Sequence, residues 1–152
     1  MKKTSVPLVI AFTPDYFIPA ATCLYSIITS MQAEGELHVI CLLSEELPER
    51  LKLKIQLIGE GRTCYSFVNL QGKLQHIYID QKYTEAASYR LLLPDLLPEY
   101  KKVIYIDCDI IVRNDLVQLY HSIDLGMNYL AAVFEASMDF QLDHLKTIGC
   151  NP

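Results

Sequence analysis

The 152-residue sequence contains no tryptophan, only six glycines, and five cysteines without any CxxC spacing. The odd number and wide scatter of the cysteines exclude a disulfide framework and do not fit a zinc site, so we expect reduced thiols in a cytosolic protein. Long apolar runs are also missing, although a membrane-spanning helix needs about 20 mostly apolar residues in succession. We therefore expect no transmembrane segment.

The beginning of the chain looks like an export signal, because Lys2 and Lys3 precede the apolar run from Val6 to Phe12. Pro14 and Asp15 then interrupt the apolar stretch, which does not suit a cleaved signal peptide. We therefore expect the protein to stay in the cytoplasm.

Clustered positive charge is also absent. The sequence has 13 basic and 18 acidic residues, for a net charge of −5. A nucleic-acid partner would require a concentrated cationic surface, so we exclude one. In contrast, the hydrophobic content of 51% and the mean hydropathy of +0.20 are sufficient for a buried core. The length fits one domain over residues 1–152.

Apolar runs of strand length alternate with segments of helix length. Strands are predicted from Val6 to Phe12, Leu37 to Leu43, Cys64 to Leu70, His76 to Ile79, Val103 to Ile106 and Tyr129 to Phe134. Helices are predicted from Ile18 to Met31, from the cap Ser44 to Gly59 and Gly61, and from the cap Thr84 until Pro94 kinks or ends it. This alternation predicts an α/β fold with a mainly parallel sheet flanked by helices.

Periodicity also predicts which side of each helix is buried. The first helix would bury Ala21, Leu24, Tyr25, Ile28 and Met31, and the second Leu47, Leu51, Ile55 and Ile58.

Two carboxylates, Asp107 and Asp109, directly follow the apolar strand from Val103 to Ile106. Ligands of open α/β sheets bind at the carboxyl ends of strands, and residues i and i+2 of extended backbone point the same way. The pair could therefore converge on a hard cation such as Mg²⁺ or Mn²⁺, which favours carboxylate oxygens and often also binds substrate phosphates. The structural alternative is a pair of solvated acids in a turn.

Several segments together resemble glycosyltransferase family 8, which includes bacterial lipopolysaccharide glucosyl- and galactosyltransferases and is related to glycogenin. The resemblance covers roughly Pro7 to Glu135. It is carried by Tyr89-Arg90-Leu91-Leu92-Leu93-Pro94, by Lys102 to Val112, and by Asp115-Leu116 with Leu119.

This resemblance implies a GT-A (Rossmann-like) fold and the transfer of a hexose, with retention, from a UDP-sugar to a glycan acceptor such as lipopolysaccharide core. Asp107-Cys108-Asp109 falls on the family's DxD motif, which binds Mn²⁺ or Mg²⁺ bridging the donor diphosphate. A divalent ion would stabilise the charge that develops on the departing diphosphate. Arg90 falls on an arginine that contacts the donor, and its alternative is a surface helix arginine.

The resemblance places Ala11, Thr13, Asp15 and Tyr16 at the family's uridine-binding loop. Thr13 replaces a common acid of this loop and Asp15 is offset from it, which leaves the nucleotide base open. Tyr16 would either stack on the base or pack against the following helix. Glu135 would either meet the donor sugar or be a solvated acid at a strand end.

The family continues beyond Pro152 with a segment lining the donor and acceptor sites and a distal histidine that completes the metal site. His121 and His144 lie in predicted helices and are not expected to replace that histidine. We therefore expect this chain to be the donor-binding part of a C-terminally truncated GT-A domain, to bind the donor weakly and to be inactive alone. We also expect exposed apolar surface that favours self-association. Any membrane association, at the inner membrane, would be peripheral.

Two alternatives remain at this stage. A haloacid-dehalogenase-like phosphatase also places an acid-x-acid pair around Mg²⁺ after a strand, although there the pair normally opens the domain. The other alternative is a non-catalytic remnant that only binds a nucleotide-sugar.

Overall fold

The computed structural model describes residues 5–32, 34–75 and 84–133. The chain divides into two compact units, Met1–Ser122 and Ile123–Pro152. Every helix and strand assigned among the described residues belongs to the first unit. In the second unit, the described residues are mostly irregular and include a turn at residues 126–127, which is closed by the Asn128 N–H donating to the Leu125 carbonyl at 2.8 Å.

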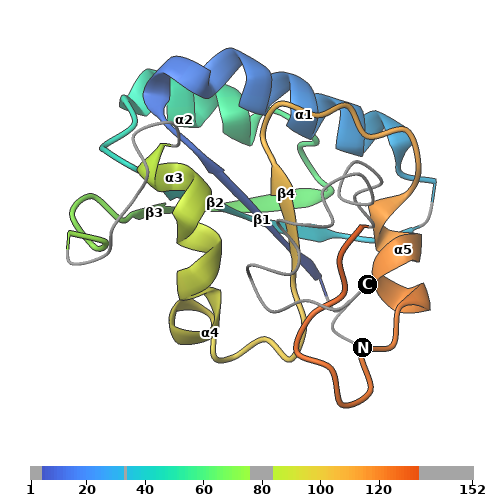
Figure 1. The fold of residues 1–152 in the computed structure, drawn as a ribbon. Helices are drawn as coiled ribbons and strands as arrows, with labels where there is room; N and C mark the ends of the chain where they lie inside the picture. Colours follow the sequence, from blue (N-terminus) through green and yellow to red (C-terminus); the bar gives the residue numbers. More distant parts are fainter. Residues whose placement is uncertain (1–4, 33, 76–83, 134–152) are drawn as a thin grey trace, which may run out of the picture. The chain divides into compact units, whose positions relative to one another are not determined.

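A four-stranded, fully parallel sheet forms the centre of the first unit, with strand order β3-β2-β1-β4 (Figure 1). The strands are β1 (Val6–Phe12), β2 (Leu37–Leu43), β3 (Thr63–Asn69) and β4 (Ile104–Asp107). All seven residues of β1 are buried, as expected for a parallel strand covered on both faces. The predicted α/β class with a parallel sheet is confirmed.

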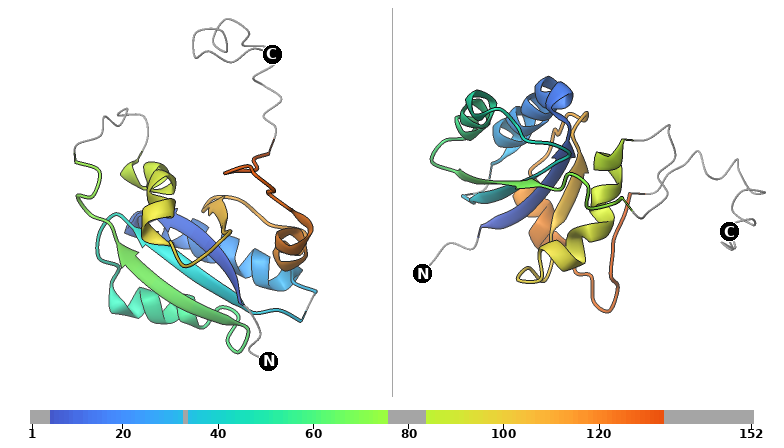
Figure 2. Two further views of the ribbon diagram at one scale, coloured as in Figure 1. Left: turned by 90° about the horizontal axis from the view of Figure 1, so that it is seen from below. Right: turned by 90° about the vertical axis from the view of Figure 1, so that its left-hand side faces the viewer.

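Helices cover both faces of this sheet (Figure 2). α1 (Phe17–Ser30), α2 (Glu49–Gln56) and α5 (Leu116–Ser122) contribute to one apolar core, together with alternate residues of β1 such as Leu8 and Ile10. The other core lies between the opposite face and the consecutive short segments α3 (Glu85–Ser88), η2 (Tyr89–Leu92) and α4 (Leu93–Leu96). The unit therefore has three layers. Among the described residues, no helix is long and apolar enough to span a membrane.

The position of α1 was predicted to within a residue, and its predicted buried face is confirmed only in part: Leu24 and Met31 are buried, and Ile28 packs against the core. The buried residues are Ala20, Cys23, Leu24, Ser26 and Ile27, whereas Tyr25 is 64% exposed. The prediction favoured the bulky side chains of the helix. The sheet instead accepts the small side chains of Ala20 and Cys23, which allow the helix to approach closely.

The second helix starts later than predicted. Ser44 does not cap it, because α2 begins at Glu49 and Pro48 occupies the N-cap position. Its apolar stripe is confirmed: Ile55 is fully buried, and Leu47 just before the helix is 1% exposed. The predicted end is also confirmed. Gly59 has a φ of +72°, the left-handed conformation that glycine adopts most easily.

The third predicted helix is divided into α3, η2 and α4. Thr84 occupies the N-cap position as predicted, although its side chain makes no capping hydrogen bond. Pro94 lies in the first turn of α4, where its missing N–H costs no helical hydrogen bond. Pro94 therefore marks the start of a new helical turn. The fixed backbone of proline suits that place.

Two predicted strands are not among those observed. Residues 76–79 lie outside the described residues. The strand predicted from Tyr129 to Phe134 is wrong over residues 129–133, which have no strand structure, and Phe134 lies outside the described residues. No described strand pairs with this segment, and a strand is stable only when its backbone groups have a partner.

Candidate functional site

The candidate site lies where strand order reverses, at the carboxyl ends of β1 and β4. The chain passes from β1 to β2 on one side, while β4 joins the other side of β1. Ala11 and Asp107 are register partners on these two strands. Ligands of open α/β sheets bind at such a switch point, so the fold places the DxD segment where a ligand is expected.

Alternation along β4 determines where each of its side chains points. Ile104 and Ile106 pack into the core beneath α1, whereas Tyr105 packs on the face covered by α3, η2 and α4. By the same alternation, Asp107 follows Tyr105 onto the second face. Cys108 then returns to the α1 core, where it is 9% exposed.

Three contacts hold the Arg90 side chain over the end of β4. Its Nε donates to the Ala87 carbonyl at 2.8 Å and its Nη2 donates to Asp107 Oδ1 at 3.0 Å. The guanidinium also lies 4.8 Å from the centroid of the Tyr105 ring, within the range of a cation–π interaction. Arg90 is thus a surface arginine of η2 that is tied to the end of β4, and its contact with a donor remains a prediction. Arg90 and Asp107 are nevertheless about half exposed and open to a ligand.

The second acid, Asp109, is exposed and lies in a turn. β4 ends at Asp107, and Cys108 and Asp109 form the turn that follows. The expectation of extended backbone across both acids is therefore wrong. The convergence of Asp107 and Asp109 on one cation remains a prediction.

The chemistry of the donor set fits a hard divalent cation with few protein ligands. Asp107 and Asp109 offer exposed carboxylates, while the intervening Cys108 thiol is buried in the core and directed away from them. Among the described residues, no group of three or more His, Cys, Asp or Glu side chains could hold a metal. A cation here would take its remaining ligands from water or from a substrate phosphate, as Mg²⁺ commonly does.

The predicted base-binding loop is a short 3₁₀ turn, η1 (Pro14–Tyr16), between β1 and α1. It is closed by the Tyr16 N–H donating to the Thr13 carbonyl at 2.9 Å. Asp15 is exposed and Tyr16 is 47% exposed at the N-cap of α1. In the described part of the chain, neither side chain contacts Arg90 or Asp107 through a hydrogen bond or ion pair. The roles of Thr13, Asp15 and Tyr16 therefore remain predictions.

The remaining predicted residues are only partly described. Glu135 and His144 lie outside the described residues. His121 lies in the last turn of α5, as the predicted helix implied, with its ring 5.3 Å from that of Tyr120.

Two buried thiols lie beneath the site. Burial, followed by the nearby Cys108, raises the pKa of Cys23 from 9.0 to about 11. Burial likewise raises the pKa of Cys108, with Asp109 adding to the effect. Both therefore remain neutral thiols at physiological pH. The four cysteines that the structure describes are all free, as predicted, and Cys150 lies outside the described residues.

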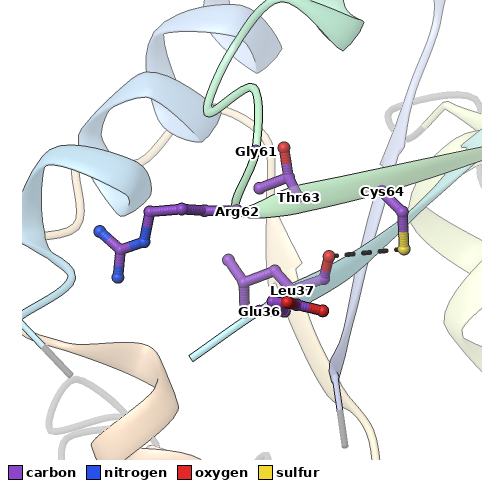
Figure 3. A pocket seen from close by; sticks show the side chains of 6 residues that line it. All are labelled: Glu36, Leu37, Gly61, Arg62, Thr63 and Cys64. Atoms are coloured by element: carbon purple, nitrogen blue, oxygen red, sulfur yellow. Dashed lines mark hydrogen bonds between the residues drawn. The ribbon is translucent and has the colours of Figure 1, made fainter. Parts of the chain in front are cut away.

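A shallow hollow occurs at the opposite end of the sheet (Figure 3). It lies at the amino ends of β2 and β3 and is lined by Glu36, Leu37, Gly61, Arg62, Thr63 and Cys64. In Figure 3, the Arg62 side chain extends away from the contact between the Cys64 thiol and the Leu37 carbonyl, whose atoms are 3.6 Å apart. The hollow is thus separate from the switch point.

Sequence reasoning missed Tyr105 and two serines of α1, Ser26 and Ser30. Tyr105 could have been found, because it lies two residues before Asp107 on the same strand. The serines hydrogen-bond to the segment after β4, but their only signal was the i, i+4 spacing of two hydroxyls on one helix.

Comparisons with known proteins identify the family of this chain. A sequence model of "Glycosyl transferase family 8" matches residues 7–148. General stress protein A of Bacillus subtilis (strain 168) is 24% identical over 96% of this chain, which spans 52% of that protein's length. The glycosyltransferase GlyE of Streptococcus pneumoniae serotype 4 is 32% identical over 61% of this chain and 23% of its own.

Solved structures show the same fold. The galactosyltransferase LgtC, in complex with donor and acceptor sugar analogues, matches with a TM-score of 0.78 at 22% identity, over 96% of this chain and 52% of its own. The bifunctional glycosyltransferase WbbM matches with a TM-score of 0.79 at 24% identity, over 93% of this chain and 25% of its own. Together with the family match, these likenesses establish the GT-A fold, and the chain belongs to glycosyltransferase family 8.

Proposed function

We propose that this chain forms the nucleotide-sugar-binding part of a metal-dependent, retaining hexosyltransferase. The observation that carries the proposal is the meeting of Arg90 and Asp107 at the switch point between β1 and β4. Family membership supports the reaction class. It also sets aside the phosphatase alternative.

The proposed donor is a UDP-sugar, with its diphosphate next to Asp107 and Asp109. These carboxylates would hold Mn²⁺ or Mg²⁺, which supplies positive charge against the departing diphosphate. Arg90 would bind the donor phosphate or sugar through its guanidinium, because its fork of donors matches phosphate oxygens. The Cys108 backbone would connect the two carboxylates within the turn that follows β4.

The uridine would lie over the loop after β1. Ala11 is buried beside Asp107, so it would form the floor below the nucleotide. Thr13 and Asp15 would supply polar groups at this loop, and the half-exposed Tyr16 ring would stack on the base. Glu135 would meet the donor sugar.

In the transfer, the bond between the anomeric carbon and the diphosphate oxygen breaks, and its electron pair leaves with UDP. A new bond forms from the anomeric carbon to an acceptor hydroxyl, which loses its proton. The proposed acceptor is a glycan such as a lipopolysaccharide core, and the proposed location is the cytoplasm, with any attachment to the inner membrane peripheral.

Calorimetric titration of the chain with UDP tests the donor site, in Mn²⁺ and again with a chelator. We expect metal-dependent binding that Asp107→Ala or Asp109→Ala weakens at least tenfold, because each variant removes a carboxylate ligand. Asp95→Ala is the matched control, since Asp95 is an exposed acid on α4. Metal-independent binding, or equal losses in all three variants, would contradict the proposal.

A further inference from the structure

The segment between β4 and α5 runs alongside α1 and is attached to it at successive points (Figure 1). The Cys23 thiol lies 3.8 Å from the Asp107 carbonyl, and Ser26 and Ser30 contact Val112. The attachment points follow the same order along both segments. α1 therefore contacts the chain both before and after the turn formed by Cys108 and Asp109.

A further attachment follows the end of α1. The Gln32 N–H donates to Asp115 Oδ2 at 2.9 Å, while Asp115 Oδ1 accepts from the Val117 N–H at 2.8 Å and thereby caps α5. The end of the segment is thus fixed as firmly as its beginning.

Val112 is held through both of its backbone polar groups. Its N–H donates to Ser26 Oγ at 2.9 Å. Its carbonyl lies 2.8 Å from Ser30 Oγ, whose single proton is shared with the Ser26 carbonyl at 2.7 Å. Ser26 is 9% exposed and its own hydroxyl donates to the Cys23 carbonyl at 2.7 Å, which orients the lone pair that Val112 uses. Val112 lies outside the sheet, so these serines supply the partners that a sheet ladder would otherwise provide.

We infer that Ser26 and Ser30 are positioning residues for the carboxylates of Asp107 and Asp109, an inference that rests on the proposed function. Asp109 lies between the fixed end of β4 and the fixed Val112. Its carboxylate is exposed, so only its backbone is restrained before a ligand binds. Ordering even one or two residues of a free loop on binding costs about 1–2 kcal/mol each, which corresponds to roughly tenfold in affinity per residue.

The other hydroxyls of α1 provide matched controls. Thr22 Oγ1 donates to the Ile18 carbonyl at 2.9 Å, and Thr29 Oγ1 donates to the Tyr25 carbonyl at 3.0 Å. Both bonds stay within the helix. Thr22→Ala and Thr29→Ala therefore remove a helix hydroxyl without touching the segment after β4.

The test measures amide hydrogen exchange at residues 107–113 and Mn²⁺ affinity by electron paramagnetic resonance, with UDP titration alongside. We expect Ser26→Ala and Ser30→Ala to accelerate exchange at Val112 and to lower Mn²⁺ affinity about tenfold, while Thr22→Ala and Thr29→Ala leave both unchanged. Ser30→Thr retains a hydroxyl and should restore the affinity.

Ser30 is half-buried, so Ser30→Ala gives a folded variant even where loss of the more deeply buried Ser26 hydroxyl unfolds the chain. Faster exchange at Val112 with Mn²⁺ and UDP affinities equal to those of the threonine controls would overturn the inference while leaving the proposed function intact. Absence of Mn²⁺-dependent UDP binding in the unmodified chain would overturn both.

Discussion

Arg90 Nη2 and Asp107 Oδ1 are 3.0 Å apart, and this ion pair joins η2 to the end of β4. The guanidinium is thus bonded to one of the carboxylate oxygens that a cation would use as a ligand. The two side chains are 46% and 56% exposed, so solvent screens their attraction and the pair contributes only about 0–1 kcal/mol. A divalent cation should therefore displace Arg90 from Asp107 easily.

Arg90→Ala should then have opposite effects on metal and nucleotide. Without the competing guanidinium, the affinity for Mn²⁺ alone should rise by up to about fivefold, the equivalent of a surface ion pair. UDP affinity in saturating Mn²⁺ should fall about tenfold or more, because a hydrogen bond to a charged group contributes about 1.5–3 kcal/mol. Paramagnetic resonance and calorimetry measure the two affinities. A parallel loss of both would mean that Arg90 supports the turn and does not compete with the metal.

Gly59 and Gly61 should differ in their tolerance of alanine. Both have positive φ, which costs an alanine about 1–2 kcal/mol. A Cβ on Gly59 would also lie 2.9 Å from Ile28 of α1, whereas one on Gly61 would meet nothing within 4 Å. Crowding should add about 1–3 kcal/mol at Gly59 alone. Urea denaturation of the two variants tests this, and equal destabilisation would disprove the close packing of Gly59 on α1.

Cys23 should make the folded state less stable in alkali. Burial raises its pKa from 9.0 to about 11, so the folded state keeps a proton that the unfolded state loses. Stability should fall as pH rises through this window, by about 1.4 kcal/mol per pH unit for one proton. Cys23→Ala should reduce the slope of unfolding free energy against pH between pH 9 and 11 by up to about 1.4 kcal/mol per pH unit, the contribution of one proton. Urea denaturation at successive pH values measures this slope. Cys64→Ala, at an exposed cysteine, is the control, and identical slopes for both variants would refute the assignment.

The outer faces of α1 and α2 should mediate weak self-association. Tyr25 and Ile18 of α1, Leu53 of α2 and Leu57 at the C-cap of α2 are all more than half exposed. We expect the sedimentation coefficient to rise with protein concentration, because covering apolar surface is favourable. Leu57→Glu should reduce this dependence, whereas Gln56→Glu, an equal charge change at the exposed end of α2, should reduce it less. A single coefficient at all concentrations would rule out association through this surface.

The strands were easier to predict from the sequence than the helix faces. β1 and β2 were predicted with their observed boundaries, because continuous apolar runs are buried on both sides and their ends are marked by polar residues. The buried face of α1 was predicted only in part, because the helical periods that begin at Ala20 and at Ala21 both contain apolar residues. Packing against the sheet determines which of the two faces is buried, and that packing cannot be read from the local sequence.

The candidate site was predicted in composition but not in arrangement. Asp107 and Arg90 were identified by their surroundings in the sequence, but their ion pair depends on how η2 crosses the sheet. The turn at Asp109 was named only as part of the alternative of two solvated acids, and extended backbone across both acids was expected instead. Ser26 and Ser30 act through backbone groups roughly 80 residues away, a relationship that only the folded chain creates.

The parallel pairing of β4 with β1 also has a consequence for the order of folding. Ala11 and Asp107 are register partners although roughly 100 residues separate them, so this pairing closes the longest loop in the sheet and is expected to form slowly. β1, α1, β2, α2 and β3 are synthesised first, and together they can bury apolar surface before β4 leaves the ribosome. The binding site would then be the last part of the sheet to assemble. A nascent chain would be compact for some time before it could recognise a nucleotide.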